Sequence, residues 1–363
     1  MTTTNGAKLR VGFVGVGAMG QCAHLRNYAC IPECDVVAIS ELKGQQGQLV
    51  ADHYGVPSVY TDHREMLEKE NLDALVAIQL FERHGVIVKE LAQSGLPMLI
   101  EKPLASSVEV AEEILATIEK SGTKLMVAYH KRSDPATEFV KEKIEEFKES
   151  GELGEMRYVR VTMPAGEWIN NGFREMINTD EEVPELEMDA PGSSMSEAER
   201  GQHSPFINYY IHQVNLVRHL LGEPYCVDYA VPSGVVMAGK SASGVSYVLE
   251  MSPYLTTVDW QECAFIGFKR GTIKLQLPPP MAHNRPGKVE ILRDTGDAVP
   301  EVTVPHLPAI DAMYNQALNF IKFARGEDST SPCEAHYAIE DLRIAHDYVR
   351  QLVAAEGSIS TYW

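Results

Sequence analysis

Three glycines near the start of the chain have the spacing of a phosphate-binding turn. Gly15, Gly17 and Gly20 lie in the segment GVGAMG, where an apolar run at 9–16 meets a helical pattern at 18–30. In such a unit the first glycine permits a tight turn, the second lets a pyrophosphate approach the backbone, and the third lets helix and strand pack closely. We therefore expect the turn to bind the phosphates of a dinucleotide at the helix start. The predicted residues are Gly15, Gly17, Ala18, Met19 and Gly20.

An acidic residue, Glu41, follows the second apolar run, residues 35–40. A carboxylate there accepts hydrogen bonds from ribose hydroxyls and repels a 2′-phosphate. This favours NAD as the cofactor, with NADP as the less favoured alternative because Lys43 is close by. Two further candidates for cofactor binding follow the fourth predicted strand, Gln79 and His84.

The tripeptide Glu101-Lys102-Pro103 follows the predicted strand 97–100 at its carboxyl end, the edge where parallel sheets bind ligands. Pro103 lacks an N–H and restricts the turn. A lysine held there, partly desolvated, can hydrogen-bond a substrate hydroxyl and relay its proton. We expect Glu101 and Lys102 to lie at the cofactor as well. Taken alone, the same three residues also fit a solvated lysine beside a surface glutamate.

The elements that would position these residues alternate between strand and helix up to about residue 130. A capping-box spacing, Ser106 and Glu109, predicts the start of a helix that ends at Gly122. This alternation is typical of a doubly wound parallel sheet. The strands are expected at 9–16, 35–40, 59–60, 72–78, 97–100 and 124–129.

After about residue 150 the pattern changes to short strands joined by glycine-containing turns, which favours a mainly antiparallel sheet. We expect strands at 156–163, 225–237, 243–252, 258–269, 271–277 and 288–293, and helices at 134–149, 207–221, 311–325 and 334–354. The fold class is therefore α/β. It comprises an N-terminal Rossmann domain, 1–130, and a C-terminal α+β domain, 131–363, with a large open sheet. The terminal helices either stay with the second domain or pack back on the first.

Residues 180–199 carry eight acidic residues and no lysine or arginine. A solvated loop is the simplest interpretation. A mobile lid or a subunit contact is the alternative.

Composition narrows the classes of function. The 363 residues carry a net charge of −19 and no basic cluster, which argues against a nucleic-acid partner. No apolar run is long enough for a membrane span, so no membrane partner is expected. The six cysteines are scattered, with no CxxC, which favours reduced, buried thiols, a cytoplasmic location and no metal site.

Four features together resemble the Gfo/Idh/MocA oxidoreductases. They are GVGAMG, Glu41, the EKP tripeptide and the segment VAYHKRSDP at 127–135. The resemblance continues through IHQVNLVRHLLG at 211–222 and ALNFIKFARGE at 317–327. It implies that Lys102 is catalytic, that the substrate is a small polyol or sugar-like molecule, and that the chain forms a homodimer or homotetramer through its C-terminal sheet.

The family's second motif is an Asp followed four residues later by a His. His212 matches the His, whereas the Asp position is Asn208. At this spacing both side chains lie on one helix face, but an amide does not stabilise an imidazolium as a carboxylate does. The resemblance implies that His212 is catalytic. Further expected substrate contacts are His130, Trp168, Arg174 and Asn208.

Three functions remain open at this point. The first is reversible hydride transfer between a secondary alcohol and NAD, with His212 as general base assisted by Lys102. The second is an enzyme that retains NAD and uses transient oxidation for elimination, epimerisation or glycoside cleavage. The third is a nucleotide-sensing regulator without catalysis.

Overall fold

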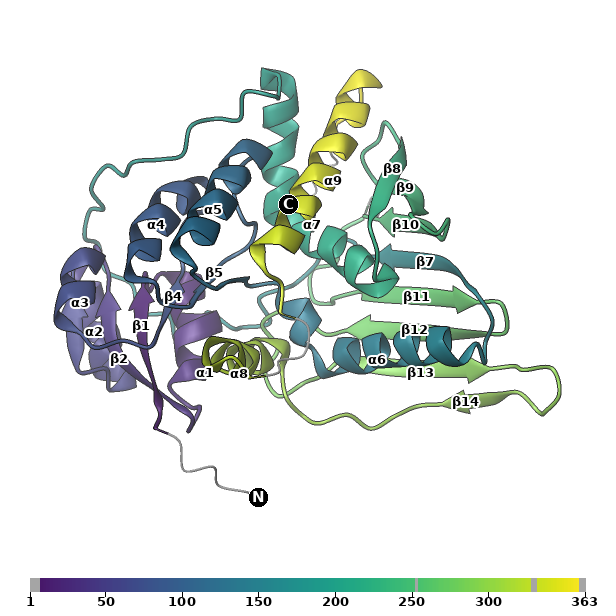
Figure 1. Cartoon of the computed structure of the whole chain (residues 1–363), viewed down its shortest axis with the longest axis horizontal. Coiled ribbons are helices and arrows are strands. Elements are labelled where there is room, and N and C mark those ends of the chain that lie inside the picture. Colours follow the sequence, from purple (N-terminus) through teal and green to yellow (C-terminus); the bar gives the residue numbers. More distant parts are fainter. Residues whose placement is uncertain (1–6, 252–253, 328–331, 359–363) are drawn as a thin grey trace. The chain divides into compact units, whose positions relative to one another are not determined.

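The computed structural model describes residues 7–251, 254–327 and 332–358. Within these ranges the chain forms two sheets and divides into two compact units (Figure 1). The first unit contains residues 1–128, 171–191 and 316–336, and the second contains the rest. A single boundary at residue 130 does not describe this division, because two later segments return to the first unit.

The first unit holds a six-stranded parallel sheet of order β3-β2-β1-β4-β5-β6. Its centre is β1, whose Val11 and Phe13 are fully buried. The reversal of strand order between β1 and β4 is the switch point at which doubly wound sheets bind ligands. The strands are β1 (Leu9–Val14), β2 (Cys34–Ser40), β3 (Ser58–Tyr60), β4 (Ala74–Ala77), β5 (Met98–Ile100) and β6 (Leu125–Val127).

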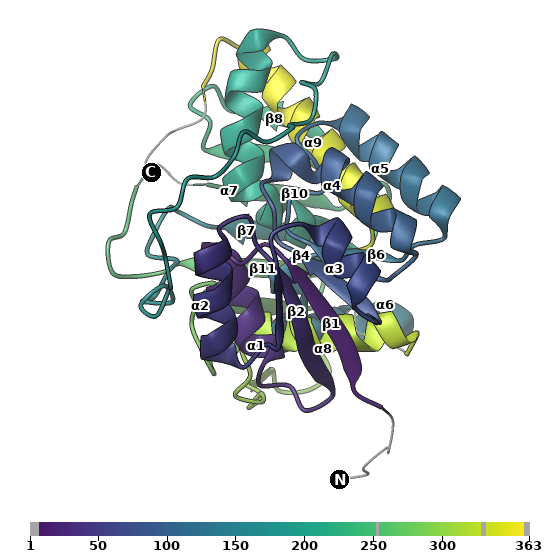
Figure 2. The same cartoon turned by 90° about the vertical axis from the view of Figure 1, so that its left-hand side faces the viewer.

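Helices cover both faces of this sheet. In Figure 2, α1 and α2 lie on one side of the strands and α3, α4 and α5 on the other. The segment after the glycine turn begins as a π-helix, Gly20–Leu25, and continues as α1 (Arg26–Tyr28). The other helices are α2 (Gly44–Tyr54), α3 (His63–Lys69), α4 (His84–Leu91) and α5 (Val108–Ser121).

The predicted cap of α5 is wrong by one residue. Ser107, not Ser106, is the N-cap, and its side chain accepts a hydrogen bond from the backbone N–H of Val110. The helix ends as expected, at Gly122 in the left-handed region. Two adjacent serines compete for the same position, and their spacing to a later glutamate does not decide between them.

Contacts of the later segment 316–336 tie it to the Rossmann fold of the first unit. In α8 (Ala312–Arg325), Phe320 packs against Tyr28 of α1, with ring centroids 6.4 Å apart. The carbonyl of Cys333 accepts a hydrogen bond from the N–H of Val127 in β6 at 2.8 Å. These contacts place part of the C-terminal region on the Rossmann fold.

The second unit holds an eight-stranded sheet of order β14-β13-β12-β11-β7-β10-β9-β8. All neighbouring pairs are antiparallel except β7 and β10. The fold class predicted from the sequence is thus confirmed. The strands are β7 (Met156–Thr162), β8 (Tyr225–Ala230), β9 (Val236–Ser241), β10 (Ser246–Glu250), β11 (Glu262–Phe268), β12 (Gly271–Leu277), β13 (Lys288–Arg293) and β14 (Glu301–Thr303).

Two strand predictions need correction. The run 225–237 is not one strand, because a turn with Gly234 at φ +71° separates β8 from β9. The run 243–252 contains only β10, and its last residue lies outside the described ranges.

Three helices complete the second unit: α6 (Pro135–Ser150), α7 (Glu197–Leu221) and α9 (Ala335–Ala354). Of these, α6 packs on β12 and α7 on β7. The start of α7 lies well before residue 207, because Ser196 and Glu199 form a capping box. The last two acids of the acidic segment, Glu197 and Glu199, therefore belong to a helix.

Cys22, Cys34 and Cys333 are buried, as expected, whereas Cys30 and Cys226 are exposed and Cys263 is half-buried, so the expectation of buried thiols is wrong for these three. Among the described helices, none combines the length and the apolar composition needed to cross a membrane.

Candidate functional site

The glycine turn leaves the carboxyl end of β1, and its three glycines meet different constraints. Gly15 has φ +93°, and a Cβ there would lie 2.3 Å from the carbonyl oxygen of Ile78. A Cβ on Gly20 would lie 2.6 Å from the carbonyl oxygen of Gly15. A Cβ on Gly17 would meet nothing within 4 Å. Gly15 and Gly20 therefore permit close backbone packing, whereas Gly17 leaves open space beside the turn.

A cavity of about 540 Å³ opens at this turn. Its volume lies within the range of roughly 300–1,000 Å³ that is usual for ligand pockets. Seven predicted cofactor residues line it: Gly15, Gly17, Ala18, Met19, Gly20, Glu41 and Gln79. Its position at the sheet's switch point and the open space at Gly17 both fit a dinucleotide.

Glu41 faces the glycine turn from the end of β2. One carboxylate oxygen accepts a hydrogen bond from the N–H of Val16 at 2.8 Å, and the other accepts from the N–H of Lys43 at 3.2 Å. The Lys43 ammonium donates to the carbonyl of Thr179 at 3.1 Å. The carboxylate therefore stands where ribose hydroxyls are bound in this fold, and Lys43 is engaged by a distant segment.

That segment, residues 177–189, is anchored at several points of the first unit and is called the strap below. At its first end, the side-chain amide of Gln21 donates to the carbonyl of Ile177 and accepts from its N–H, both at 2.9 Å. The same amide donates to the carbonyl of Val16 in the glycine turn at 2.7 Å. One glutamine thus ties the strap to the phosphate-binding turn.

Two carboxylates of the strap cap helices of the Rossmann fold. Glu181 accepts hydrogen bonds from the N–H groups of Gln45 and Gln46 in α2, at 3.0 and 2.9 Å. These bonds, Gln45 first, lower the pKa of Glu181 below its usual value.

Asp189 plays the same part at the start of α4. It accepts from the N–H groups of Gly85 and Val86, each at 2.9 Å. Burial raises the pKa of Asp189 above its usual value, against the effect of these bonds. Between the two caps, Val183 and Leu186 line the cavity.

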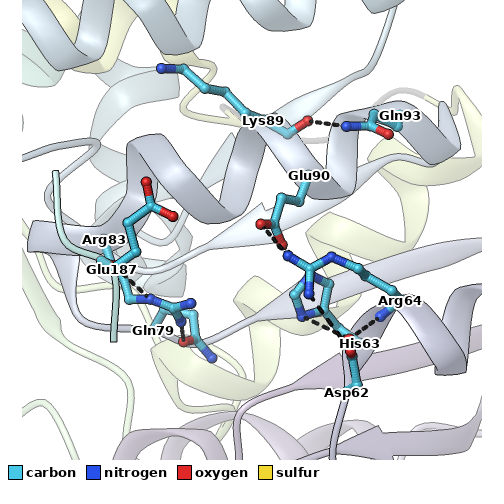
Figure 3. A network of polar contacts seen from close by, with 9 residues as sticks. All are labelled: Asp62, His63, Arg64, Gln79, Arg83, Lys89, Glu90, Gln93 and Glu187. Atoms are coloured by element: carbon cyan, nitrogen blue, oxygen red, sulfur yellow. Dashed lines mark hydrogen bonds and ion pairs between the residues drawn. The ribbon is translucent and has the colours of Figure 1, made fainter. Parts of the chain in front are cut away.

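Arg83 connects the strap with the floor of the cavity (Figure 3). Its guanidinium donates to the carbonyl of Glu187 at 3.0 Å and to the side-chain oxygen of Gln79 at 3.1 Å. Gln79 in turn donates to the carbonyl of Val14 at 3.1 Å. This chain of hydrogen bonds runs from the strap to the end of β1.

Buried groups contact the turn that carries Lys102. Glu101 accepts hydrogen bonds from the Lys102 N–H at 3.0 Å and lies 2.7 Å from Nε2 of His24. Burial opposes ionisation of Glu101, but the contacts with His24 and Lys102 outweigh it and hold its pKa below the usual value. Lys102 itself is half-buried, and the Lys102–Pro103 peptide bond is cis.

His84 lies behind the same turn. Its side chain is fully buried, and Nδ1 is 3.1 Å from the carbonyl oxygens of Pro103 and Leu104. Burial lowers the pKa of His84, which favours a neutral imidazole that donates from Nδ1. His84 therefore supports the loop after Lys102, and its contact with the cofactor stays a prediction.

In the second unit, α7 brings His212 beside two residues that follow β6. The ring of His130 lies 4.6 Å from that of His212, and the ring of Tyr129 lies 5.9 Å from it, both edge to face. His212 is half-buried, and Asn208 is exposed one turn earlier. Two of the predicted substrate residues, His130 and His212, are thus neighbours.

Lys131, which directly follows His130 in the chain, forms a buried ion pair with Glu262. Nζ of Lys131 lies 2.5 Å from Oε2 of Glu262, which is fully buried. The other oxygen, Oε1, accepts from the Gln213 amide at 2.7 Å, and Oε2 also accepts from the Trp260 indole at 3.2 Å. Lys131 also stands over the Trp260 ring, 5.5 Å from its centroid. Glu262 thus contacts three donors, two of which, Lys131 and Gln213, directly follow His130 and His212 in the chain.

Comparison with known proteins agrees with this geometry. Residues 9–129 match the family model described as "Oxidoreductase family, NAD-binding Rossmann fold". Residues 9–129 therefore form an NAD-binding Rossmann fold of the oxidoreductase type, in agreement with the cofactor predicted from Glu41 and the glycine turn.

The relatives that match the chain are distant in sequence. The oxidoreductase YrbE of Bacillus subtilis, itself uncharacterised, is 23% identical over 92% of this chain and 91% of its own length. The scyllo-inositol 2-dehydrogenase (NAD⁺) of the same organism is 26% identical over 56% of this chain and 60% of its own. Levoglucosan dehydrogenase, solved with NADH and levoglucosan, shares the fold with a TM-score of 0.70 and 18% identity, covering 96% of this chain and 98% of its own.

The other predicted substrate residues fall in different units. Trp168 is half-buried in the second unit, where its carbonyl accepts from the N–H of Met281 at 3.2 Å. Arg174 is exposed and belongs to the first unit. Their contact with substrate, like that of Asn208, stays a prediction.

Several residues of the site were missed by sequence reasoning. His24 and Gln21 follow the glycine turn, Glu262 lies on β11, and Glu181 and Asp189 lie in the acidic segment. Only the acidic segment carried a signal, its unbroken negative charge, and that signal did not say which carboxylates cap helices.

Proposed function

We propose that the chain oxidises a secondary alcohol of a sugar, glycoside or cyclitol and transfers the hydride to NAD. The single observation that supports this most is the turn that carries Lys102. Buried Glu101 and His84 hold that turn at the carboxyl edge of an NAD-binding sheet. When bound, NAD supplies the hydride acceptor.

Lys102, His212 and His130 bind the substrate and accept its proton. Lys102 hydrogen-bonds the substrate hydroxyl, and its half-buried position reduces the competition of water for that hydrogen bond. His212 accepts the hydroxyl proton as general base. His130, in ring contact with His212, orients that imidazole or the substrate beside it. A sugar, glycoside or cyclitol is favoured because named relatives include an inositol dehydrogenase and a levoglucosan dehydrogenase.

The test combines a substrate screen with one variant. Sugars, glycosides and cyclitols are assayed with NAD and NADP, and K102A is compared with wild type on the best substrate. Loss of a proton-relaying group should lower kcat by about 10²–10⁴-fold. The dissociation constant of NADH should stay close to that of wild type. K120A, which removes an exposed lysine of α5, is the matched control. Near-normal turnover by K102A would refute the proposal.

The strap favours a second candidate, an enzyme that keeps NAD bound through transient oxidation and reduction. A segment anchored across the cofactor cavity suits a cofactor that is not exchanged in each turnover. Mass analysis of the purified protein distinguishes the two. Bound NAD that survives purification, with no NADH released during turnover, supports the retained cofactor, and stoichiometric NADH release supports the dehydrogenase.

A further inference from the structure

We propose that the strap, residues 177–189, is a clasp that controls the release of the dinucleotide, with Glu181 and Asp189 as its two anchors. The proposal concerns the cofactor alone. It needs no assumption about the substrate, so a failure to find an oxidised polyol leaves it unaffected.

Both anchors cap helices of the Rossmann fold that lack a side-chain cap of their own. The first N–H groups of a helix have no partner within the helix, and a side chain at the N-cap usually accepts from them. The N-cap residues of α2 and α4 are Lys43 and Arg83, and neither caps its own helix. By contrast, α3 is capped by its own Asp62. The strap therefore supplies the N-cap acceptors that the N-cap residues of α2 and α4 do not provide.

The two anchors lie on either side of the cofactor cavity. Glu181 binds the start of α2, which follows β2, and Asp189 binds the start of α4, which follows β4. In the sheet, β1 lies between β2 and β4 and carries the glycine turn. The residues between the anchors therefore cross the carboxyl edge above the switch point, where Val183 and Leu186 line the cavity. A dinucleotide bound there lies beneath the strap.

Polar contacts, rather than a buried apolar core, hold the strap. Val183 is 48% exposed, and every residue from 177 to 189 is exposed or half-buried. Segments with few buried apolar contacts open at a lower free energy than the core does. Breaking the two anchors should therefore free the strap while the sheet and its helices stay folded.

The strap contacts residues predicted to bind the cofactor, and these contacts couple opening of the strap to cofactor release. Gln21 joins Ile177 to the glycine turn, and Arg83 joins Glu187 to Gln79 in the cavity wall. Residues that face the bound dinucleotide are thus tied to the strap at both ends. Opening the strap loosens both ends, so the rate of opening sets an upper limit to the rate of cofactor release.

The test measures the rate constant of NADH release from the full chain, by displacing NADH with excess NAD and following nicotinamide fluorescence. The double variant E181Q/D189N keeps side-chain size and removes both anchoring charges. Loss of one helix-capping carboxylate is worth about fivefold in an equilibrium, and the double variant loses two, so we expect release about tenfold or more faster than in wild type. E182Q/E185Q removes two charges from exposed positions of the same strap and should release NADH at the wild-type rate.

Two outcomes would overturn the proposal. The first is equal release rates for E181Q/D189N, E182Q/E185Q and wild type. The second is hydrogen exchange of the strap amides that NADH does not slow. If the double variant does not fold, the single variants E181Q and D189N are measured in the same way. An increase in either supports the clasp, and wild-type rates in both refute it.

Discussion

Nε2 of His24 lies 2.7 Å from Oε1 of Glu101, and both side chains are buried. His24 belongs to the helical segment after the glycine turn, and Glu101 directly precedes Lys102. One buried contact therefore links the phosphate-binding turn to the lysine that we propose as catalytic. A shift of either element would disturb the other.

Replacing Glu101 by Gln tests this link through pH. The pKa of Glu101 is lower in the folded chain than its ordinary value of 4.5. The folded state therefore binds this proton less tightly than the unfolded chain does, so the carboxylate stabilises the fold above that pH and loses its contribution as the pH falls. We expect E101Q to lower the free energy of unfolding at pH 7 by about 1–3 kcal/mol. Urea unfolding from pH 7 down to about pH 3 should show a constant gap to wild type above about pH 5 and a narrowing gap below the ordinary pKa of 4.5. A gap that stays constant over this range would contradict the assignment.

The three glycines of the turn predict that some substitutions lower the stability of the fold and that another weakens NADH binding alone. Replacing Gly15 or Gly20 by Ala brings the new Cβ within 2.6 Å of backbone oxygen, so both variants should be destabilised. Gly17 faces open space, so G17V should unfold within about 0.5 kcal/mol of wild type, as surface substitutions do. Because its side chain takes space beside the phosphates, we expect G17V to weaken NADH binding at least about tenfold. Thermal unfolding and NADH fluorescence titration check the two parts. Wild-type affinity in G17V would show that Gly17 does not face the cofactor.

The part of the site that the sequence predicts well depends on residues close together in the chain. The glycine turn, Glu41 and Gln79 each follow a buried strand of the same sheet, and parallel strands bring their carboxyl ends to one edge. Strand ends separated by helices of ordinary length are therefore enough to place these residues at one cavity.

The strap and the Glu262 cluster could not be predicted in the same way. Glu181 caps a helix whose residues 45 and 46 lie far earlier in the chain, and no periodic pattern links the two segments. Lys131 and Glu262 are likewise separated by 131 residues. The early start of α7 has a local signal, the spacing of Ser196 and Glu199, although Pro205 lies inside the helix.

The pair of Lys131 and Glu262 predicts a strongly non-additive pair of substitutions. E262Q leaves the ammonium of Lys131 buried without a counter-charge, which should destabilise the fold by about 3–5 kcal/mol. K131M/E262Q removes both charges and keeps an amide oxygen as acceptor for Gln213, so it should be less destabilised than E262Q alone. Urea unfolding of the two single variants and the double variant measures the coupling. Additive losses would show that the ion pair does not act as a unit.

The last prediction concerns Asn208, which stands where the family resemblance implies an acid. Asn208 lies one helical turn before His212, so a carboxylate at this position would favour the protonated imidazole. If His212 is the general base, N208D needs a higher pH to supply its neutral form. We expect the acid limb of the pH profile of kcat/KM to move to higher pH by about half a unit or more. S204D adds the same charge to an exposed position one turn further from His212 and should leave the limb in place. An acid limb that N208D does not move, or that S204D moves equally, would argue against His212 as the base.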